Sequence, residues 1–169
     1  MKRVLITMIV AALAFGAAVA QAGQGGNCSP EGTWYGDNNW GYIWIVTISR
    51  SGPKSFTTVM DNGANPLSED LEQSTDWRGE LVKTGPHEYD WTTMAYWRVV
   101  AGAYGPFPLV LGLCPASAEF TSCDSWQAAG YCEIYGYFPG DDPFADGIYL
   151  GTEDGLLAQF KRMPMSFPE

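Results

Sequence analysis

The chain has 169 residues, a length that suits one domain with a sizeable core. Acidic residues number 19 against 9 basic ones, so the formal net charge is -10 at pH 7. This balance argues against nucleic acid and anionic membranes as partners, because both are bound through clustered lysine and arginine. The sequence shows no low-complexity segment and no internal repeat at a fixed period.

Residues 1–22 predict a secretory signal peptide. Lys2 and Arg3 precede an apolar run over residues 4–20, and the small residues around Ala22 suit cleavage. An uncleaved anchor is the alternative, but a spanning helix needs about 20 apolar residues. We expect a periplasmic or extracellular product, cut near Ala22 and not inserted in a membrane. Loss of Lys2 and Arg3 leaves 7 basic and 19 acidic residues, a net charge of -12.

The mature chain is expected to hold a flexible segment over residues 23–30 and one β domain over residues 31–169. Its first part predicts an opening segment, two strands joined by a Ser-Gly-Pro turn, and a long polar connection. These elements cover residues 32–36, 40–49, 55–61 and 62–74.

Residues 75–100 predict the central β-hairpin, which turns at residues 84–87. Beyond the turn, Tyr89, Trp91 and Trp97 alternate with more polar side chains, and this period of two is typical of a half-buried antiparallel strand. A two-stranded ribbon is marginal in water, so the aromatic face of this hairpin must pack against other elements.

The last third predicts further short strands and a closing hairpin, over residues 109–113, 119–123, 131–138, 147–151 and 156–163. About eight to ten strands, no convincing long helix and loops rich in Gly and Pro predict an all-β fold. Consecutive hairpins favour an antiparallel up-and-down barrel, with a β-sandwich as the alternative.

The four cysteines, Cys28, Cys114, Cys123 and Cys132, all follow the predicted signal peptide. An even number in an exported chain predicts two disulfides. Spacing alone allows three pairings; we expect Cys123 with Cys132 and Cys28 with Cys114. Zinc binding is the rival reading, but the chain has no C-x-x-C pair and one histidine, so no metal site is expected.

Gly32-Thr33-Trp34, placed before the first strand, resembles the G-x-W motif that opens lipocalin-type barrels. The resemblance is one of architecture. It implies that Gly32 and Trp34 close one end of a barrel, and that Trp34 packs against a basic side chain of the last strand. Arg162, or Lys161, would take that place.

A barrel of about eight strands either holds a small ligand or is filled by its own side chains. We expect a small apolar ligand inside the barrel. The residues expected to contact it are Trp44, Phe56, Tyr89, Trp91, Trp97 and Arg98. The first alternative is a packed barrel whose surface aromatics, Trp40, Trp126 and Tyr137, bind a glycan or a protein.

A barrel enzyme of the cyclase or isomerase type is the second alternative, with Arg98, Glu80 and Tyr96 as its candidate polar groups. His87 lies in a Gly-Pro turn, where a solvated turn residue is a better reading than a general base or haem ligand. The acidic loop over residues 141–146 does not match a calcium-loop spacing. No catalytic residue and no cofactor is expected.

Overall fold

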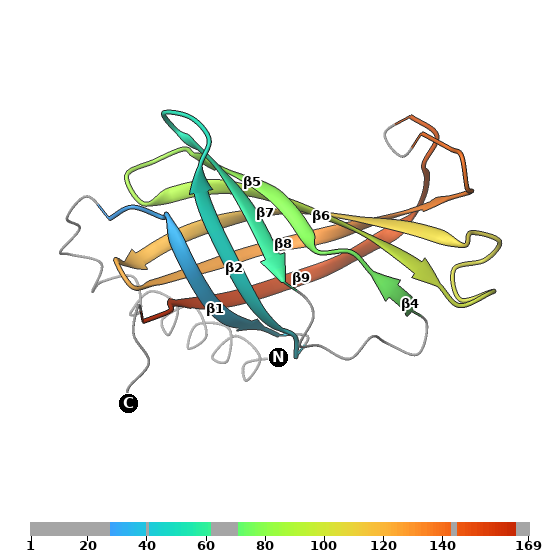
Figure 1. Cartoon of the computed structure of the whole chain (residues 1–169), viewed down its shortest axis with the longest axis horizontal. Helices are drawn as coiled ribbons and strands as arrows, with labels where there is room; N and C mark the ends of the chain where they lie inside the picture. The colour runs from blue at the N-terminus through green and yellow to red at the C-terminus, as the bar shows by residue number, and fades with distance from the viewer. Residues whose placement is uncertain (1–27, 40, 62–70, 143–144, 165–169) are drawn as a thin grey trace, which may run out of the picture.

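A computed structural model describes residues 28–39, 41–61, 71–142 and 145–164 of the chain (Figure 1). The predicted signal peptide and Trp40 lie outside this part. Every regular element within the described part is a β-strand. The strands are β1 (Gly32–Asn38), β2 (Ile43–Arg50), β3 (Ser55–Asp61), β4 (Leu71–Ser74), β5 (Trp77–Lys83), β6 (Glu88–Val99), β7 (Leu109–Ser122), β8 (Ser125–Tyr137) and β9 (Ile148–Arg162).

The strands form one antiparallel sheet in the order β4-β6-β5-β3-β2-β1-β9-β8-β7, and a further β6–β7 pairing closes it. Eight strands therefore make a closed up-and-down barrel, and β4 is an extra strand that pairs with the end of β6. The predicted fold class is confirmed, and the sandwich alternative is wrong.

The central hairpin is formed by β5 and β6, which pair from Arg78 opposite Met94 to Lys83 opposite Tyr89. Its aromatic face is buried, as the alternation predicted: Tyr89 and Trp91 point inward, and Asp90 between them is exposed.

The predicted closing hairpin is wrong, because its two strands are one 15-residue strand, β9. The Thr-Glu-Asp-Gly stretch resembles a turn, but Gly155 has a φ of 79° and is the extra residue of a bulge. Leu156 pairs with Gly130 and Asp154 pairs with Tyr131, so Gly155 has no partner across the ladder. A glycine in this conformation is typical of a bulge that bends a continuous strand.

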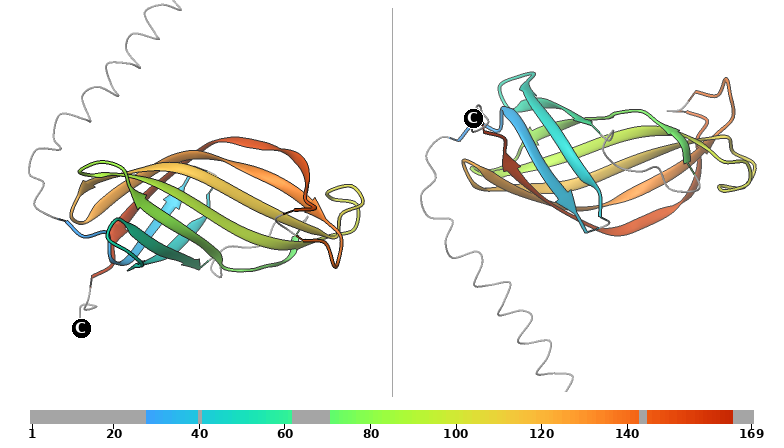
Figure 2. Two further views of the ribbon diagram at one scale, coloured as in Figure 1. Left: turned by 90° about the horizontal axis from the view of Figure 1, so that it is seen from above. Right: turned by 60° about the horizontal axis from the view of Figure 1, so that its bottom comes forward.

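The barrel is lopsided, because β6 to β9 have 12 to 15 residues each, whereas β1, β2 and β3 have 7 or 8. β1 pairs with β9 only from residue 158 to 162, so the long strands continue past the short ones at one end (Figure 2). We call this end the extended half, and the end that holds the start of β1 and the β7–β8 turn the closed end.

Aromatic side chains fill the closed end. Trp34, Trp91, Trp126 and Phe160 are all at most 2% exposed. The rings of Trp126 and Phe160 stack with centroids 4.0 Å apart, and Trp91 meets the Trp126 ring edge-on at 5.1 Å. Aromatic pairs in these geometries gain stability beyond their buried area. This part of the barrel interior is therefore filled by the protein itself.

Candidate functional site

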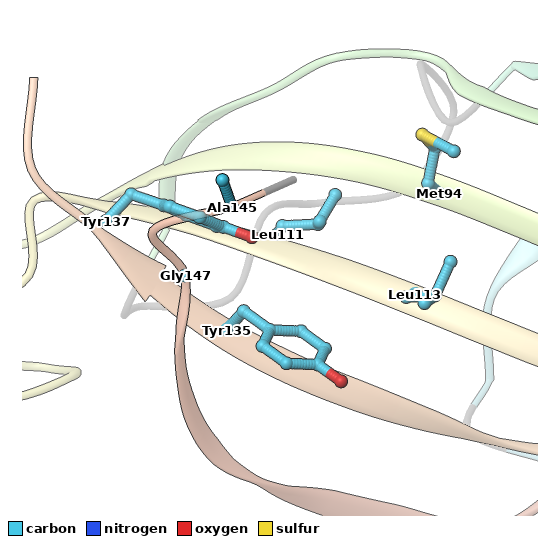
Figure 3. A pocket seen from close by; sticks show the side chains of 7 residues that line it. All are labelled: Met94, Leu111, Leu113, Tyr135, Tyr137, Ala145 and Gly147. Atoms are coloured by element: carbon cyan, nitrogen blue, oxygen red, sulfur yellow. The ribbon is translucent and has the colours of Figure 1, made fainter. Parts of the chain in front are cut away.

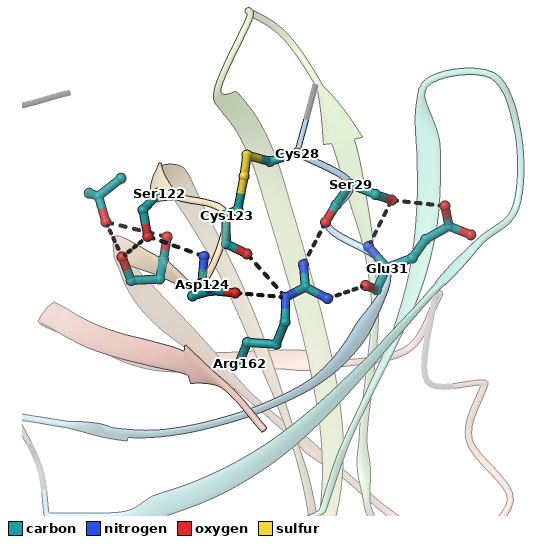
Figure 4. Close-up of a disulfide and its surroundings, with 9 residues drawn as sticks. Cys28, Ser29, Glu31, Ser122, Cys123, Asp124 and Arg162 are labelled. Atoms are coloured by element: carbon teal, nitrogen blue, oxygen red, sulfur yellow. Dashed lines mark hydrogen bonds and ion pairs between the residues drawn. A yellow bond between two sulfur atoms is a disulfide. The ribbon is translucent and has the colours of Figure 1, made fainter. Parts of the chain in front are cut away.

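Arg162 binds the N-terminal segment to the closed end of the barrel (Figure 4). Its guanidinium donates hydrogen bonds to the backbone oxygens of Glu31 and Ser29, each at 2.8 Å, and of Cys123 at 3.0 Å. Its central carbon lies 4.2 Å from the centroid of the Trp34 ring, which is fully buried. Arg162 and Trp34 thus adopt the packing that the lipocalin resemblance implied.

Gly32 makes room for this arrangement. Its backbone φ is 135°, a value that residues with a side chain rarely adopt. A Cβ at this position would lie 2.6 Å from Nη1 of Arg162. Lys161, the alternative basic residue, is exposed. The glycine and the tryptophan of the motif, Gly32 and Trp34, therefore both lie against the Arg162 guanidinium.

Glu31 carries a local hydrogen-bond network next to this cluster. Ser29 Oγ donates to its carboxylate at 2.9 Å, and Arg50 Nη2 donates to the same oxygen at 3.1 Å. The hydrogen bond from Ser29, followed by that from Arg50, lowers the pKa of Glu31.

The disulfides join Cys28 to Cys123 and Cys114 to Cys132, so the expected pairing is wrong. Most of the residues between Cys123 and Cys132 belong to β8. Seven residue steps of strand, from Ser125 to Cys132, span about 23 Å, which is far beyond the reach of one disulfide. Cys114 instead lies beside Cys132 on the neighbouring strand, and Cys28 reaches the β7–β8 turn.

Four of the six expected ligand residues, Trp44, Phe56, Tyr89 and Trp91, belong to the buried core. Phe56 and Tyr89 contact each other, with ring centroids 6.1 Å apart. Trp91 is buried and donates from Nε1 to Thr58 Oγ1 at 3.1 Å. Arg98 does not join the other five residues, because it is exposed and follows the inward-facing Trp97 on the strand.

Trp44 and Trp97 meet in the extended half through a third tryptophan, Trp77. The Trp77 ring lies 6.5 Å from that of Trp44 and 5.2 Å from that of Trp97. Trp97 packs over Gly112, where a Cβ would collide with its ring. Trp77 was not among the residues expected to contact a ligand, although its place at the start of the first hairpin strand could have indicated it. We call Trp44, Trp77 and Trp97 the tryptophan trio.

Two indole N–H groups of the tryptophan trio have no hydrogen-bond acceptor among the described residues. They belong to Trp44, which is 5% exposed, and Trp77, which is 8% exposed. A buried N–H group without an acceptor is costly, and most such groups in folded proteins are paired. These two donors are therefore available to an acceptor that enters the interior.

The outer face of the extended half carries a pocket of about 240 Å³ (Figure 3). Its floor and walls come from β6, β7 and β8, and two residues after β8 cover one side. The lining residues are Met94, Leu111, Leu113, Tyr135, Tyr137, Ala145 and Gly147. The available signal in the sequence was the alternation of Tyr135 and Tyr137 along β8, which places both side chains on one face of the strand.

Aspartate side chains accept backbone hydrogen bonds in the segment after β8. Asp141 Oδ2 accepts from the Phe138 backbone N–H at 2.8 Å, and Asp146 Oδ2 accepts from that of Asp142 at 2.9 Å. Gly147 then packs against the Tyr137 ring, because a Cβ there would lie 2.5 Å from the phenolic oxygen. The acidic loop thus caps its own turns and reaches back over β8.

Tyrosine pKa values in this region are raised. Burial, followed by nearby negative charge, raises the pKa of Tyr137 and of Tyr96. At Tyr135 the first cause is the hydrogen bond that its hydroxyl donates to Glu133 Oε2 at 2.7 Å. All three therefore remain neutral phenols near neutral pH.

The residues of the two alternative functions, surface binding and barrel catalysis, do not lie together in one site. Trp126 is 1% exposed, so it is a core residue and its prediction as a surface aromatic is wrong. Glu80 and Arg98 are exposed, and Tyr96 is half-buried on the outer face. The backbone oxygen of His87 accepts from Phe120 N–H at 2.9 Å.

The described part of the chain brings no three potential metal ligands of the His, Cys, Asp or Glu type together. Within the same ranges, no helix has the length and apolar character needed to cross a bilayer.

Comparison with known proteins gives a likeness of structure and none of sequence. No protein-family model matches the chain, and no curated protein matches its sequence. Among solved structures, the chain is similar to a redesigned β-barrel, with 12% sequence identity and a TM-score of 0.48. The match covers 79% of this chain and 91% of that one. The assignment to the barrel class therefore rests on the strand pairing of the chain itself.

Proposed function

We propose that this protein is an exported, disulfide-bonded barrel that binds a small apolar ligand in the extended half of its interior. Export is supported by the basic and apolar start of the sequence and by two disulfides, which are typical of oxidising compartments. Release into the periplasm or the medium, after cleavage near Ala22, belongs to this proposal.

The observation that carries the ligand proposal is the pair of buried indole N–H groups on Trp44 and Trp77. A ligand with a carbonyl or ether oxygen would satisfy them, while its apolar body packs on the aromatic rings. Small-molecule sites are commonly lined by apolar and aromatic groups with a few polar atoms that fix orientation. The tryptophan trio has this composition.

The extended half suits a ligand better than the closed end for a geometric reason. At the closed end, the Trp126 ring is stacked between two others: its centroid lies 5.6 Å from that of Phe120 and 4.0 Å from that of Phe160. In the extended half, long strands on one side of the barrel face short strands on the other. The strands of the described part of the chain thus leave the barrel wall incomplete there, and a ligand could enter beside the tryptophan trio.

The test uses Nile red, a neutral apolar fluorophore with a carbonyl acceptor, titrated into the oxidised protein. We expect saturable fluorescence enhancement with one site per chain. Trp44→Phe and Trp77→Phe keep an aromatic ring but remove the N–H donor, so each should weaken binding about fivefold, the effect of one lost hydrogen bond.

Trp126→Phe is the matched control. Its N–H also has no acceptor among the described residues, but the ring lies within the aromatic stack of the closed end. This variant should bind Nile red as the unaltered protein does. Absence of saturable binding, or equal effects of all three substitutions, would contradict the interior site.

A further inference from the structure

We propose that the outer pocket is a second binding site, and that it takes a small organic cation: an ammonium group joined to an apolar body of about one ring. The site is separate from the tryptophan trio, because its lining residues alternate with the inward-facing residues along β6, β7 and β8. The outer site is therefore independent of the proposed interior ligand.

The floor of the pocket selects an apolar body. Met94 lies opposite Leu113, and Leu111 lies opposite Tyr135 across neighbouring strands. Tyr137, which is 4% exposed, forms the wall toward the end of β8. No lining side chain carries a charge, so the body of the ligand must be apolar where it contacts the floor. A volume of about 240 Å³ accommodates one ring with a short substituent.

At the Tyr135 side of the pocket, the Tyr135 hydroxyl and the neighbouring Glu133 carboxylate accept hydrogen bonds and do not donate them to a ligand. Tyr135 uses its hydroxyl proton in the hydrogen bond to Glu133 Oε2. The remaining lone pairs of Tyr135 Oη and of the Glu133 carboxylate can only accept, so a ligand there must supply donors. An ammonium group has three donors and adds charge to the interaction, which strengthens each hydrogen bond.

Charge is distributed along one row of residues that crosses the outer face. Arg78, Met94, Leu113 and Glu133 lie opposite one another on successive strands from β5 to β8. Three strand spacings place the Arg78 backbone about 14 Å from that of Glu133. The negative end of the row is thus at β8, beside Tyr135, and the positive end is across the apolar floor.

The tyrosine rings and the overall charge also favour a cation. Aromatic faces attract ammonium groups, and the rings of Tyr135 and Tyr149 meet edge-on with centroids 5.7 Å apart. The excess of carboxylates over the whole chain raises the local concentration of cations near its surface. Anions of the same size should be disfavoured by Glu133.

The experiment compares three ligands of matched size on the oxidised protein by isothermal titration calorimetry. They are 2-phenylethylamine, 2-phenylethanol and 3-phenylpropionate. We expect the amine to bind at least about tenfold more tightly than the alcohol, because a charged donor replaces a neutral one, and the carboxylate to bind least. Added salt should weaken binding of the amine and leave that of the alcohol unchanged.

Glu133→Gln removes the negative charge but keeps a side-chain acceptor for Tyr135. It should abolish the preference for the amine over the alcohol. Glu119→Gln is the matched control, since Glu119 is a half-buried carboxylate on β7, opposite Gln127 and far along the strand from the pocket. It should leave the preference intact.

Equal binding of the amine and the alcohol, tighter binding of the carboxylate, or no binding of any of the three overturns the proposal. If Glu133→Gln does not fold, the ligand series on the unaltered protein decides the question alone. Displacement of Nile red by the amine would place the amine in the interior and would also contradict a separate outer site.

Discussion

The Arg162 guanidinium covers the face of the Trp34 ring, with 4.2 Å between its central carbon and the ring centroid. Trp34 in turn donates from Nε1 to the backbone oxygen of Pro30 at 2.8 Å. The first strand, the last strand and the segment before them are therefore joined at one point. A cation held against an aromatic face and largely removed from water contributes about 1 to 2 kcal/mol.

Arg162→Ala should lower the free energy of unfolding by about 3 kcal/mol, because the guanidinium loses its aromatic contact and three backbone acceptors. Arg162→Lys should recover only part of this, since an ammonium cannot reach all three acceptors from one position. Lys161→Ala, on the exposed side of the same strand, should change the value by less than about 0.5 kcal/mol. Urea unfolding measures all three, and equal effects at both positions would contradict the assigned role.

Peptide mapping without reduction should find Cys28 linked to Cys123 and Cys114 linked to Cys132. Acidic residues separate the four cysteines, so digestion after Asp and Glu places each one on its own peptide. The intact chain should be four hydrogens lighter than its reduced form. A peptide that joins Cys123 to Cys132 would show that the register of β7 and β8 is not the one described.

Gly36→Ala should lower the free energy of unfolding by about 2 kcal/mol or more, a typical cost of overpacking. A Cβ at Gly36 would collide with the Gln159 backbone oxygen and the Phe160 ring. Gly151→Ala is the control within β9, because nothing lies within 4 Å of a Cβ there. Thermal and urea unfolding should separate the two variants clearly; similar values would mean that β1 and β9 are not so closely paired.

The stability contributed by Glu31 should depend on pH. Its pKa is lowered in the folded state, so the ionised form of the side chain is more strongly favoured in the folded chain than in the unfolded chain. The contribution is present above the ordinary carboxyl range and is lost as the pH falls through the folded-state pKa. The difference in unfolding free energy between the unaltered protein and Glu31→Gln should therefore shrink on acidification. A difference that grows at low pH would reverse the assigned sign.

The barrel class could be predicted because its strongest signal is local. Alternation along residues 89–99 indicates one buried face, and most of the hairpin turns contain Gly or Pro; the β7–β8 turn, Cys123-Asp124, contains neither. The Trp34 and Arg162 contact was also accessible, since a short motif at one end implied a basic partner at the other.

The cysteine pairing and the shape of β9 were not accessible in the same way. The short separation of Cys123 and Cys132 in the sequence favours a disulfide between them, whereas β8 holds the two residues apart as an extended strand. A glycine such as Gly155 is typical both of a hairpin turn and of a β-bulge. Only the pairing of Asp154 and Leu156 with β8 shows that Gly155 lies in a bulge. The outer pocket depends on a segment that returns over β8, which no local pattern specifies.

The pairing of β1 with β9 has a consequence for folding kinetics. Trp34 lies opposite Arg162, so the seam of the barrel joins residues that are far apart in the sequence. Proteins dominated by such distant pairings fold in about milliseconds to seconds, because chain entropy is lost before the contacts form. Sealing must wait until β9 has left the ribosome. Until then the edges of β1 and β8 that pair with β9 have no partner, so the barrel cannot close while the chain is still being synthesised.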